Sequence, residues 1–377
     1  MTLHNATPFK AGYNLGLEKS GHHCLVVVAK ATYRMPKDIN DSVVFISKEE
    51  QVKIHYADVE SQEDREESAL LYENDFAPFK PKCDVILNGS AYAFPLQQTT
   101  DRVVQLRVGT LDKSFRVIGK RVWQESAFNA KASKPIPFTK QAISYNVAYG
   151  GYDLDPSKPM ENEENYVPFK ANPVGQGYAP FHNTRSLIGK PLAQTEELHQ
   201  PATDPGGKKY LPQSFGVISR HWYPRYILGG TYDAHWAEHI KPFLPDDFDE
   251  HFYQCAPADQ QIAHIEGGEK VLLKGLTPDG ERMFFLPHQS VPMEVIRSNG
   301  ERETLSSVVD TLIIEPDEER FTMISRAKIK LKRSIHEVDT IIVGTTDTLW
   351  EKKRLFGECY EEETAENLET EEISHGE

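Results

Sequence analysis

The chain has 377 residues, a length that is enough for two domains or for one large β architecture. Hydrophobic residues make up 39% of it, which is adequate for a buried core. No apolar run approaches the roughly 18 residues needed to span a bilayer, and the first residues lack the charged-then-apolar pattern of a secretion signal. The formal net charge of −15 repels phosphate backbones, so direct nucleic-acid binding is disfavoured.

Four cysteines lie far apart in the sequence and include no Cys-x-x-Cys pair. This spacing is typical of reduced thiols in a cytoplasm rather than of a disulfide framework. We therefore expect a cytoplasmic protein with neither a membrane nor a nucleic acid among its partners. Its oligomeric state does not follow from the sequence.

The first part of the chain, residues 1–147, has the residue pattern of a β-module. Runs rich in β-branched residues occur at 23–35 and 83–94, and each is bounded by Gly, Pro or Asn. Residues 102–123 alternate apolar and polar on both sides of a short polar turn, which predicts a hairpin. The charge-dense stretch 57–74 fits a short surface helix or a solvated loop equally well.

The middle of the chain, residues 148–260, is crowded with Gly, Pro, Asn and aromatic residues and shows little strand periodicity. A loop-rich segment of this length usually carries function or packs over one face of a fold. β-patterns return in residues 261–350, which we expect to form a second β-module. Residues 351–377 contain nine glutamates from Gly357 onward with no Lys or Arg, and we expect them to form a disordered acidic tail.

These patterns predict a mainly β protein with antiparallel β-sandwich or barrel-like modules, a long loop-rich middle and a few short helices. One internal similarity links the two β-modules. Residues 106–123 and 312–329 align without gaps, with Phe115 opposite Phe321. An ancient duplication would explain the alignment, and so would the spacing that any two amphipathic hairpins share.

His235, Glu238 and His239 match the His-x-x-Glu-His order of inverted zinc peptidases. On a helix the two histidines would share a face and could hold one metal ion. A catalytic zinc also needs a third protein ligand, and no downstream Glu stands out in a helical frame. We therefore expect neither a metal site nor a catalytic residue here, and a metal-dependent hydrolase is the competing hypothesis.

The same stretch is expected to form a packing helix. Thr231 can cap its start, and Pro242 lies just past its expected end. Tyr232, Trp236 and Ile240 recur at i, i+4 and i+8, which predicts a stripe of buried side chains.

A second short helix is predicted just downstream, in the stretch Leu-Pro-Asp-Asp-Phe-Asp. One of its aspartates is expected to cap that helix, with Phe248 and Phe252 packed inward at i and i+4. The stretch lacks the glycine and the distal glutamate of a calcium-binding EF-hand loop.

Six separated blocks of the chain resemble one known family. They are DFAPFKPKCDVILNGSAYA, YGGYD, NPVGQGY, FGVISRHWYPR, GTYDAHWAEHIKPFLPDDFDEHFYQCAPADQQ and GGEKVLLKGLTPDGERMFFLP. In this order they are similar to the domain of unknown function 2169 family, which is encoded in bacterial type VI secretion clusters. The similarity runs from about the first strand to about Pro287 and is looser beyond Asn299.

The resemblance implies a cytoplasmic adaptor or chaperone for secreted toxins, not an enzyme, and it implies no cofactor. Such a protein would bind a toxin effector and help to load it onto the VgrG spike or the PAAR tip before secretion. A structural component of the secretion apparatus is a further hypothesis.

The family pattern and the concentration of aromatic and Arg residues in the middle of the chain indicate which residues are expected to bind a partner. These candidates are Asn172, Gly175, Gly177, Tyr178, Trp222, Arg225, Tyr232, Asp233, Trp236, Asp246, Asp247 and Asp249.

Overall fold

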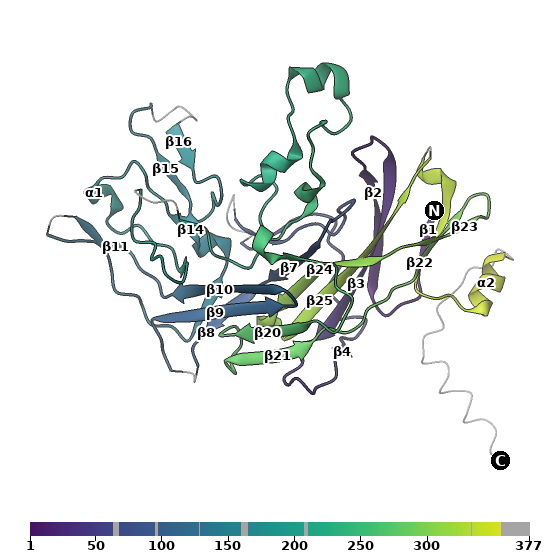
Figure 1. Ribbon diagram of the computed structural model, residues 1–377, viewed down its shortest axis with the longest axis horizontal. Helices are drawn as coiled ribbons and strands as arrows, with labels where there is room; N and C mark the ends of the chain where they lie inside the picture. Colours follow the sequence, from purple (N-terminus) through teal and green to yellow (C-terminus); the bar gives the residue numbers. More distant parts are fainter. Residues whose placement is uncertain are drawn as a thin grey trace, which may run out of the picture.

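The structure is a computed structural model that describes residues 1–62, 68–94, 97–127, 129–159, 165–206, 210–332 and 334–355. Over these residues the protein is mainly β, as the sequence predicts. Three larger sheets share one core, a loop-rich segment lies beside and above them, and short helices are scattered around (Figure 1).

The large sheet has seven strands among the described residues, in the order β19-β7-β24-β25-β3-β2, with β4 paired to β3. Its strands are β2 (Lys10–Leu17), β3 (His23–Arg34), β4 (Val44–Phe45), β7 (Cys83–Leu87), β19 (Gln261–Ile262), β24 (Val308–Glu315) and β25 (Arg320–Lys330). The second sheet contains β9 (Asp101–Val108), β10 (Leu111–Ile118), β18 (Thr195–Glu196), β20 (Lys270–Lys274) and β21 (Glu281–Phe285). The third sheet contains β1 (Thr2–Asn5), β22 (Met293–Arg297), β23 (Arg302–Leu305) and β26 (Val338–Val343).

Smaller strand pairs and short helices complete the described chain. The pairs are β5 (Val59–Glu60) with β6 (Leu70–Tyr72), β8 (Gly89–Tyr92) with β13 (Lys140–Ile143), β11 (Trp123–Glu125) with β12 (Ala130–Ala132), β14 (Tyr149–Gly150) with β17 (Gln176–Gly177), and β15 (Tyr152–Leu154) with β16 (Tyr166–Pro168). The α-helices are α1 (Thr184–Leu187) and α2 (Thr348–Leu355), and the other short helical turns are η1 (Tyr145–Val147), η3 (Arg225–Gly229), η4 (Trp236–Ile240), η5 (Glu250–Tyr253), η6 (Ala258–Gln260), η7 (Pro316–Glu318) and η8 (Ile335–Glu337).

The sheets differ from the expected architecture in two ways. The pairs β1–β26, β7–β24 and β14–β17 are parallel, and none of the sheets closes into a barrel over the described residues. Residues 1–147 and 261–350 do not form separate modules, because each of the three larger sheets combines strands from both ranges. Pairing between distant strands is non-local, so the periodicity of single strands does not reveal it.

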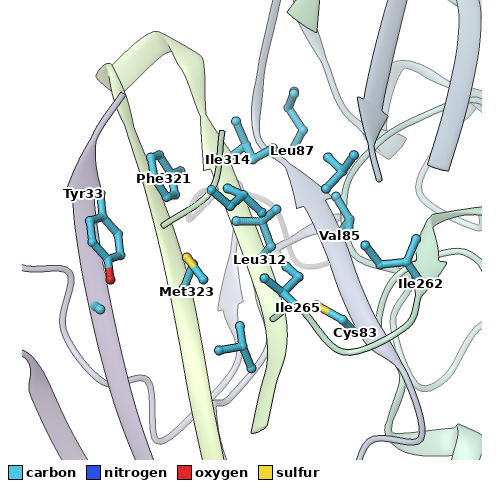
Figure 2. Packing of buried hydrophobic residues seen from close by; sticks show 14 of the residues in the cluster. Tyr33, Cys83, Val85, Leu87, Ile262, Ile265, Leu312, Ile314, Phe321 and Met323 are labelled. Atoms are coloured by element: carbon cyan, nitrogen blue, oxygen red, sulfur yellow. The ribbon is translucent and has the colours of Figure 1, made fainter. Parts of the chain in front are cut away.

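One face of the large sheet packs against the second and third sheets and forms the main core. Leu312, Ile314 and Phe321 from β24 and β25 point into this core (Figure 2). The Phe321 ring stacks on Tyr33 of β3 at 5.1 Å between centroids, and on Phe284 of β21 at 5.3 Å. These contacts join the large sheet to the second sheet.

The opposite face of the large sheet is also covered. Ten consecutive residues of β3, from Cys24 to Tyr33, are buried, which is the pattern of a strand enclosed on both faces. Val26 and Val28 belong to a second cluster that includes Val217 and Ala256 of the loop-rich segment. Part of the loop-rich segment is therefore packed onto this sheet face.

The hairpin predicted within residues 102–123 is confirmed as β9–β10, and β24–β25 is also a hairpin. Leu106 pairs with Lys113, whereas Leu312 pairs with Met323 and not with Glu319, the residue that aligns to Lys113. Aligned residues thus occupy different positions in the two hairpins, which favours common hairpin spacing over a duplication.

Two other expectations fall partly outside the described residues. Within 57–74 the described residues form the β5–β6 pair rather than a helix, and residues 63–67 are not described. The expected acidic tail, 351–377, begins inside α2, and its residues from 356 onward lie outside the described range.

Candidate functional site

Buried ion pairs hold the loop-rich segment on the second face of the large sheet. The Asp84 carboxylate of β7 accepts hydrogen bonds from Lys80 Nζ at 2.8 Å and from the Cys255 backbone N–H at 2.9 Å. Burial by itself would raise the pKa of Asp84, but Lys80 and these hydrogen bonds outweigh burial and place that pKa below its usual value. Asp84 therefore stays ionised and fixes the chain at Cys255.

Lys30, on β3, makes a second buried contact of this kind. Its side chain is fully buried, and Nζ lies 2.9 Å from Asp75 Oδ2 and 3.1 Å from His55 Nδ1. Burial lowers the pKa of Lys30, and burial followed by the Lys30 charge lowers the pKa of His55. The segment around residues 52–76 is thus attached to the sheet through charged groups.

Arg225 anchors the next part of the loop-rich segment. Its Nη2 donates to Glu73 at 2.8 and 3.0 Å, its Nε donates to the Phe252 carbonyl oxygen, and its Nη1 donates to the Ile218 carbonyl oxygen. Trp222 is 5% exposed and packs edge-on against Tyr145. Arg225 and Trp222 are buried, so in this structure they position the segment and do not belong to its outer surface.

Residues 225–253, which we call the arm, project from the sheets. Figure 1 shows the arm in green, with η4 at its outer end and η3 and η5 side by side at its base. Phe243 lies against Gly21 in the turn between β2 and β3, where a Cβ on Gly21 would come within 2.6 Å of the ring. Lys19 Nζ also donates to the Phe248 carbonyl oxygen at 2.6 Å.

The predicted buried stripe on the arm is wrong. Tyr232 is 56% exposed, Trp236 and Ile240 are only half-buried, and η4 contains no buried residue. The aromatic pair packs on itself, with the Tyr232 and Trp236 rings 4.7 Å apart and edge-on. The i, i+4 spacing correctly places the two rings together, but the arm projects, and among the described residues these rings stay largely uncovered.

The helical turn on the arm is capped by a residue other than the predicted Thr231. Asp233 Oδ1 accepts the backbone N–H of Trp236 at 2.9 Å, and the turn starts directly after Asp233. Thr231 instead donates from its backbone N–H and its hydroxyl to the Asp247 carboxylate, at 2.9 and 2.7 Å. The Thr231 hydroxyl bond, followed by the backbone bond, lowers the pKa of Asp247.

The predicted second helix is confirmed as η5, which Asp249 caps by accepting the His251 backbone N–H. Phe248 is buried and contacts the half-buried Phe252 ring at 5.7 Å. Asp246 is exposed. The three aspartates therefore have different surroundings, and they do not gather around one point.

The two histidines of the His-x-x-Glu-His match lie exposed on the arm, with their rings stacked at 4.9 Å. Glu238 Oε2 lies 3.9 Å from His239 Nδ1 and is also exposed. Among the described residues no group of three His, Cys, Asp or Glu side chains is arranged to hold a metal ion. A third protein ligand for zinc is thus missing from the described surroundings of this pair.

Asn172 supports the backbone that forms one wall of a cleft. It is fully buried, and its Nδ2 donates to the carbonyl oxygens of Tyr145 and Tyr149 at 2.8 and 3.1 Å. The chain passes so close that a Cβ on Gly150 would lie 2.1 Å from the Asn172 carbonyl oxygen. Gly175 also has no room for a side chain, since a Cβ there would lie 2.4 Å from Asn172 Nδ2.

These close approaches build one wall of a cleft of about 690 Å³. Three of the predicted residues, Gly175, Gly177 and Tyr178, line this cleft. The other walls come from β15, from α1 and from the residues that follow each of them. The volume lies within the range of roughly 300–1,000 Å³ that is usual for ligand-binding clefts.

The exposed side chains of Tyr152, Leu154 and Phe181 line the cleft and Tyr166 stacks on Tyr152, and we call these four side chains its apolar rim. They are between 40% and 54% exposed, and the Tyr152 and Tyr166 rings stack at 4.3 Å. Between Tyr152 and Leu154, the Asp153 carboxylate accepts the Phe181 backbone N–H at 2.9 Å. This bond holds the two sides of the rim together.

The rim was missed by sequence reasoning. Its residues lie in the stretch YGGYDLD and in two short segments downstream, where tyrosine and phenylalanine are as common in a core as on a surface. Only the alternation in Tyr152-Asp153-Leu154 indicates a strand with one face turned outward.

The cleft and the arm both fall within the range that a known family covers. Residues 20–326 match the family described as "uncharacterized protein conserved in bacteria (DUF2169)". The chain belongs to this family. The match to DUF2169 extends past Pro287 through β24 into β25, further than the sequence blocks suggested.

Beyond this family match, the chain matches no curated protein and no solved structure. In the described ranges, no helix has the length and apolar character that crossing a membrane would require.

Proposed function

We propose that this DUF2169 protein is a non-enzymatic, cytoplasmic adaptor that binds a type VI secretion toxin and helps to load it onto the VgrG spike or the PAAR tip. The observation that carries the proposal is the cleft with its apolar rim. Three large exposed apolar side chains line one concave site and a fourth stacks on one of them, which is typical of a surface that another protein covers.

The construction of the cleft favours binding over catalysis. Its walls are mainly glycine backbone, apolar side chains and tyrosine, and the charged residues among its described lining are Asp153 and Lys190. Asp153 is buried, is engaged with backbone N–H groups and lies 3.8 Å from Lys190 Nζ. This pair is suited to holding the rim in shape, while the rings supply rigid contact area for a partner.

The resemblance to proteins encoded in type VI secretion clusters gives the partner class. An extended segment of the toxin would lie in the cleft with apolar side chains against Tyr152 and Phe181. The adaptor would release the segment when the toxin joins the spike.

Affinity purification of the tagged protein from its own bacterium, followed by mass spectrometry, tests the proposal. We expect a protein with a toxin domain to be recovered together with a spike or tip protein. Recovery of the chain alone under conditions in which the secretion genes are expressed would contradict the proposal.

A further inference from the structure

The outer end of the arm combines exposed aromatic rings with a strong excess of negative charge. Residues 230–247, which precede the base helix η5, contain four Asp or Glu residues, one lysine and no arginine. Tyr232 is 56% exposed and Phe243 is 48% exposed, and the half-buried Trp236 ring lies edge-on to Tyr232 and donates from Nε1 to the Phe243 carbonyl oxygen. The Tyr232 and Trp236 rings therefore form one aromatic pair, next to the Phe243 backbone.

The carboxylates lie beside these rings. Asp233 directly follows Tyr232 and caps the turn that carries Trp236. Thr231, the residue before Tyr232, makes two hydrogen bonds to the Asp247 carboxylate and so holds it near the Tyr232 backbone. Lys241 is the one lysine of residues 230–247, and Lys19 donates to the Phe248 carbonyl oxygen at the base of the arm. The negative charge at the outer end thus exceeds the positive charge.

An aromatic face bordered by carboxylates is the environment that a guanidinium group prefers, because it can stack on the ring and donate two parallel hydrogen bonds to a carboxylate. The protein itself uses this combination at the base of the arm. The Arg225 guanidinium lies 5.6 Å from the centroid of the Phe252 ring and pairs with Glu73. At the outer end the rings and carboxylates are present, whereas no arginine lies within the arm there.

We propose that the outer end of the arm, formed by Tyr232, Trp236, Asp233 and the neighbouring carboxylates, is a docking surface for a positively charged, arginine-bearing segment of a protein partner. Charge complementarity selects this occupant, because an acidic segment would be repelled and an apolar segment would displace water from the carboxylates without supplying a positive charge. The proposal goes beyond the toxin-binding cleft and does not depend on it.

Tryptophan fluorescence can report directly on this surface. Trp123, Trp222 and Trp350 are buried, whereas Trp236 is half-buried. The probes are three peptides of equal length, an oligoarginine, an oligolysine and an oligoglutamate, titrated into the full chain at about 0.15 M salt. We expect the oligoarginine to change the fluorescence, to bind more tightly than the oligolysine, and to give no signal with W236F.

The decisive comparison uses a charge variant and a matched control. D233N/E238Q/D246N removes three charges from the arm and keeps a capping side chain at 233, because Asn caps as well as Asp. The control, E49Q/E125Q/E281Q, removes three exposed carboxylates elsewhere on the protein. Both variants retain the glutamates after residue 357. We expect the arm variant to bind the oligoarginine at least about fivefold more weakly than the control.

Two results would overturn the inference. Equal affinity of the arm variant and the control would place the binding elsewhere, with the acidic C-terminal residues as the alternative site. Equal binding of oligoarginine and oligolysine by the wild type would show that the rings do not recognise a guanidinium. Because the probes are simple peptides, either result would leave the toxin-binding proposal standing.

Discussion

Arg225 donates from Nη2 to both carboxylate oxygens of Glu73, and so joins the base of the arm to the segment that follows β6. The two side chains come from residues 152 positions apart and are both at least nine-tenths buried. Because the same guanidinium also bonds to two backbone carbonyl oxygens, this one residue connects three separate parts of the chain.

Removing Arg225 should therefore destabilise the protein strongly. R225A leaves the Glu73 carboxylate in a nearly buried site without its main partner, a change that typically costs about 3–5 kcal/mol. R220A is the matched control, since Arg220 also pairs with Glu73 but is about one-third exposed, and it should cost no more than about 1 kcal/mol. Urea unfolding of both variants measures the difference, and equal losses would contradict the anchoring role of Arg225.

Trp222, which precedes the arm, and Trp236, at its outer end, should differ in the same experiment. W222A removes a buried ring and should cost about 3–5 kcal/mol of unfolding free energy. W236A removes a half-buried ring that contacts mainly Tyr232 and the Phe243 backbone, so its cost should be smaller by about 2 kcal/mol or more. If W236A proved as unstable as W222A, the arm would be packed against other parts of the protein.

Gly150 should be intolerant of any side chain. G150A would place a Cβ 2.1 Å from the Asn172 carbonyl oxygen and should cost more than about 2 kcal/mol beyond the effect of G300A. Gly300 also has a positive φ, but a Cβ there meets nothing within 4 Å, so G300A measures the backbone cost alone. Thermal unfolding monitored by circular dichroism would distinguish the variants, and equal melting temperatures would show that the cleft wall can relax.

Stability should fall on mild acidification, and His55 should contribute to the fall. Burial and the Lys30 charge place the pKa of His55 below its usual value, so below about pH 6.5 the unfolded chain takes up a proton that the folded chain does not. The free energy of unfolding attributable to His55 therefore decreases as the pH falls from about 6.5 to the folded-state pKa.

H55Q should lose less stability across this pH window than the wild type, whereas H199Q, at an exposed histidine, should follow the wild type. Urea unfolding at a series of pH values provides the comparison. Parallel pH profiles for H55Q and the wild type would show that the imidazole does not sense the buried Lys30–Asp75 pair.

The sequence predicted single elements better than their assembly. Continuous apolar stretches and a hairpin were recognised because both depend on neighbouring residues, as in β3 and β9–β10. The pairing of β1 with β26 brings the two ends of the described chain together and has no local signal. The helix with Trp236 was recognised from its spacing. Whether its aromatic face is buried depends on which elements pack against it, and residue spacing does not show this.

The buried charges on the large sheet did have a signal in the sequence. Lys30 interrupts the apolar run VVVAKATY, and Asp84 stands just after Cys83 at the start of another strand. A charged residue inside a fully apolar strand has to be paired, because an unpaired charge is too costly to bury. The partners Asp75 and Lys80 lie in loops, so their identity could come only from the structure.

The most direct test of the adaptor proposal compares toxin recovery between two surface variants. Y152S/F181S removes two side chains of the apolar rim, and L15S/I136S removes two side chains of similar exposure elsewhere. All four are exposed, so both variants should fold with stability close to that of the wild type. In quantitative mass spectrometry of affinity-purified samples, the account predicts that the rim variant loses most of the toxin while the control retains it. Undiminished toxin recovery by a folded Y152S/F181S protein would contradict the central claim that the cleft binds the cargo.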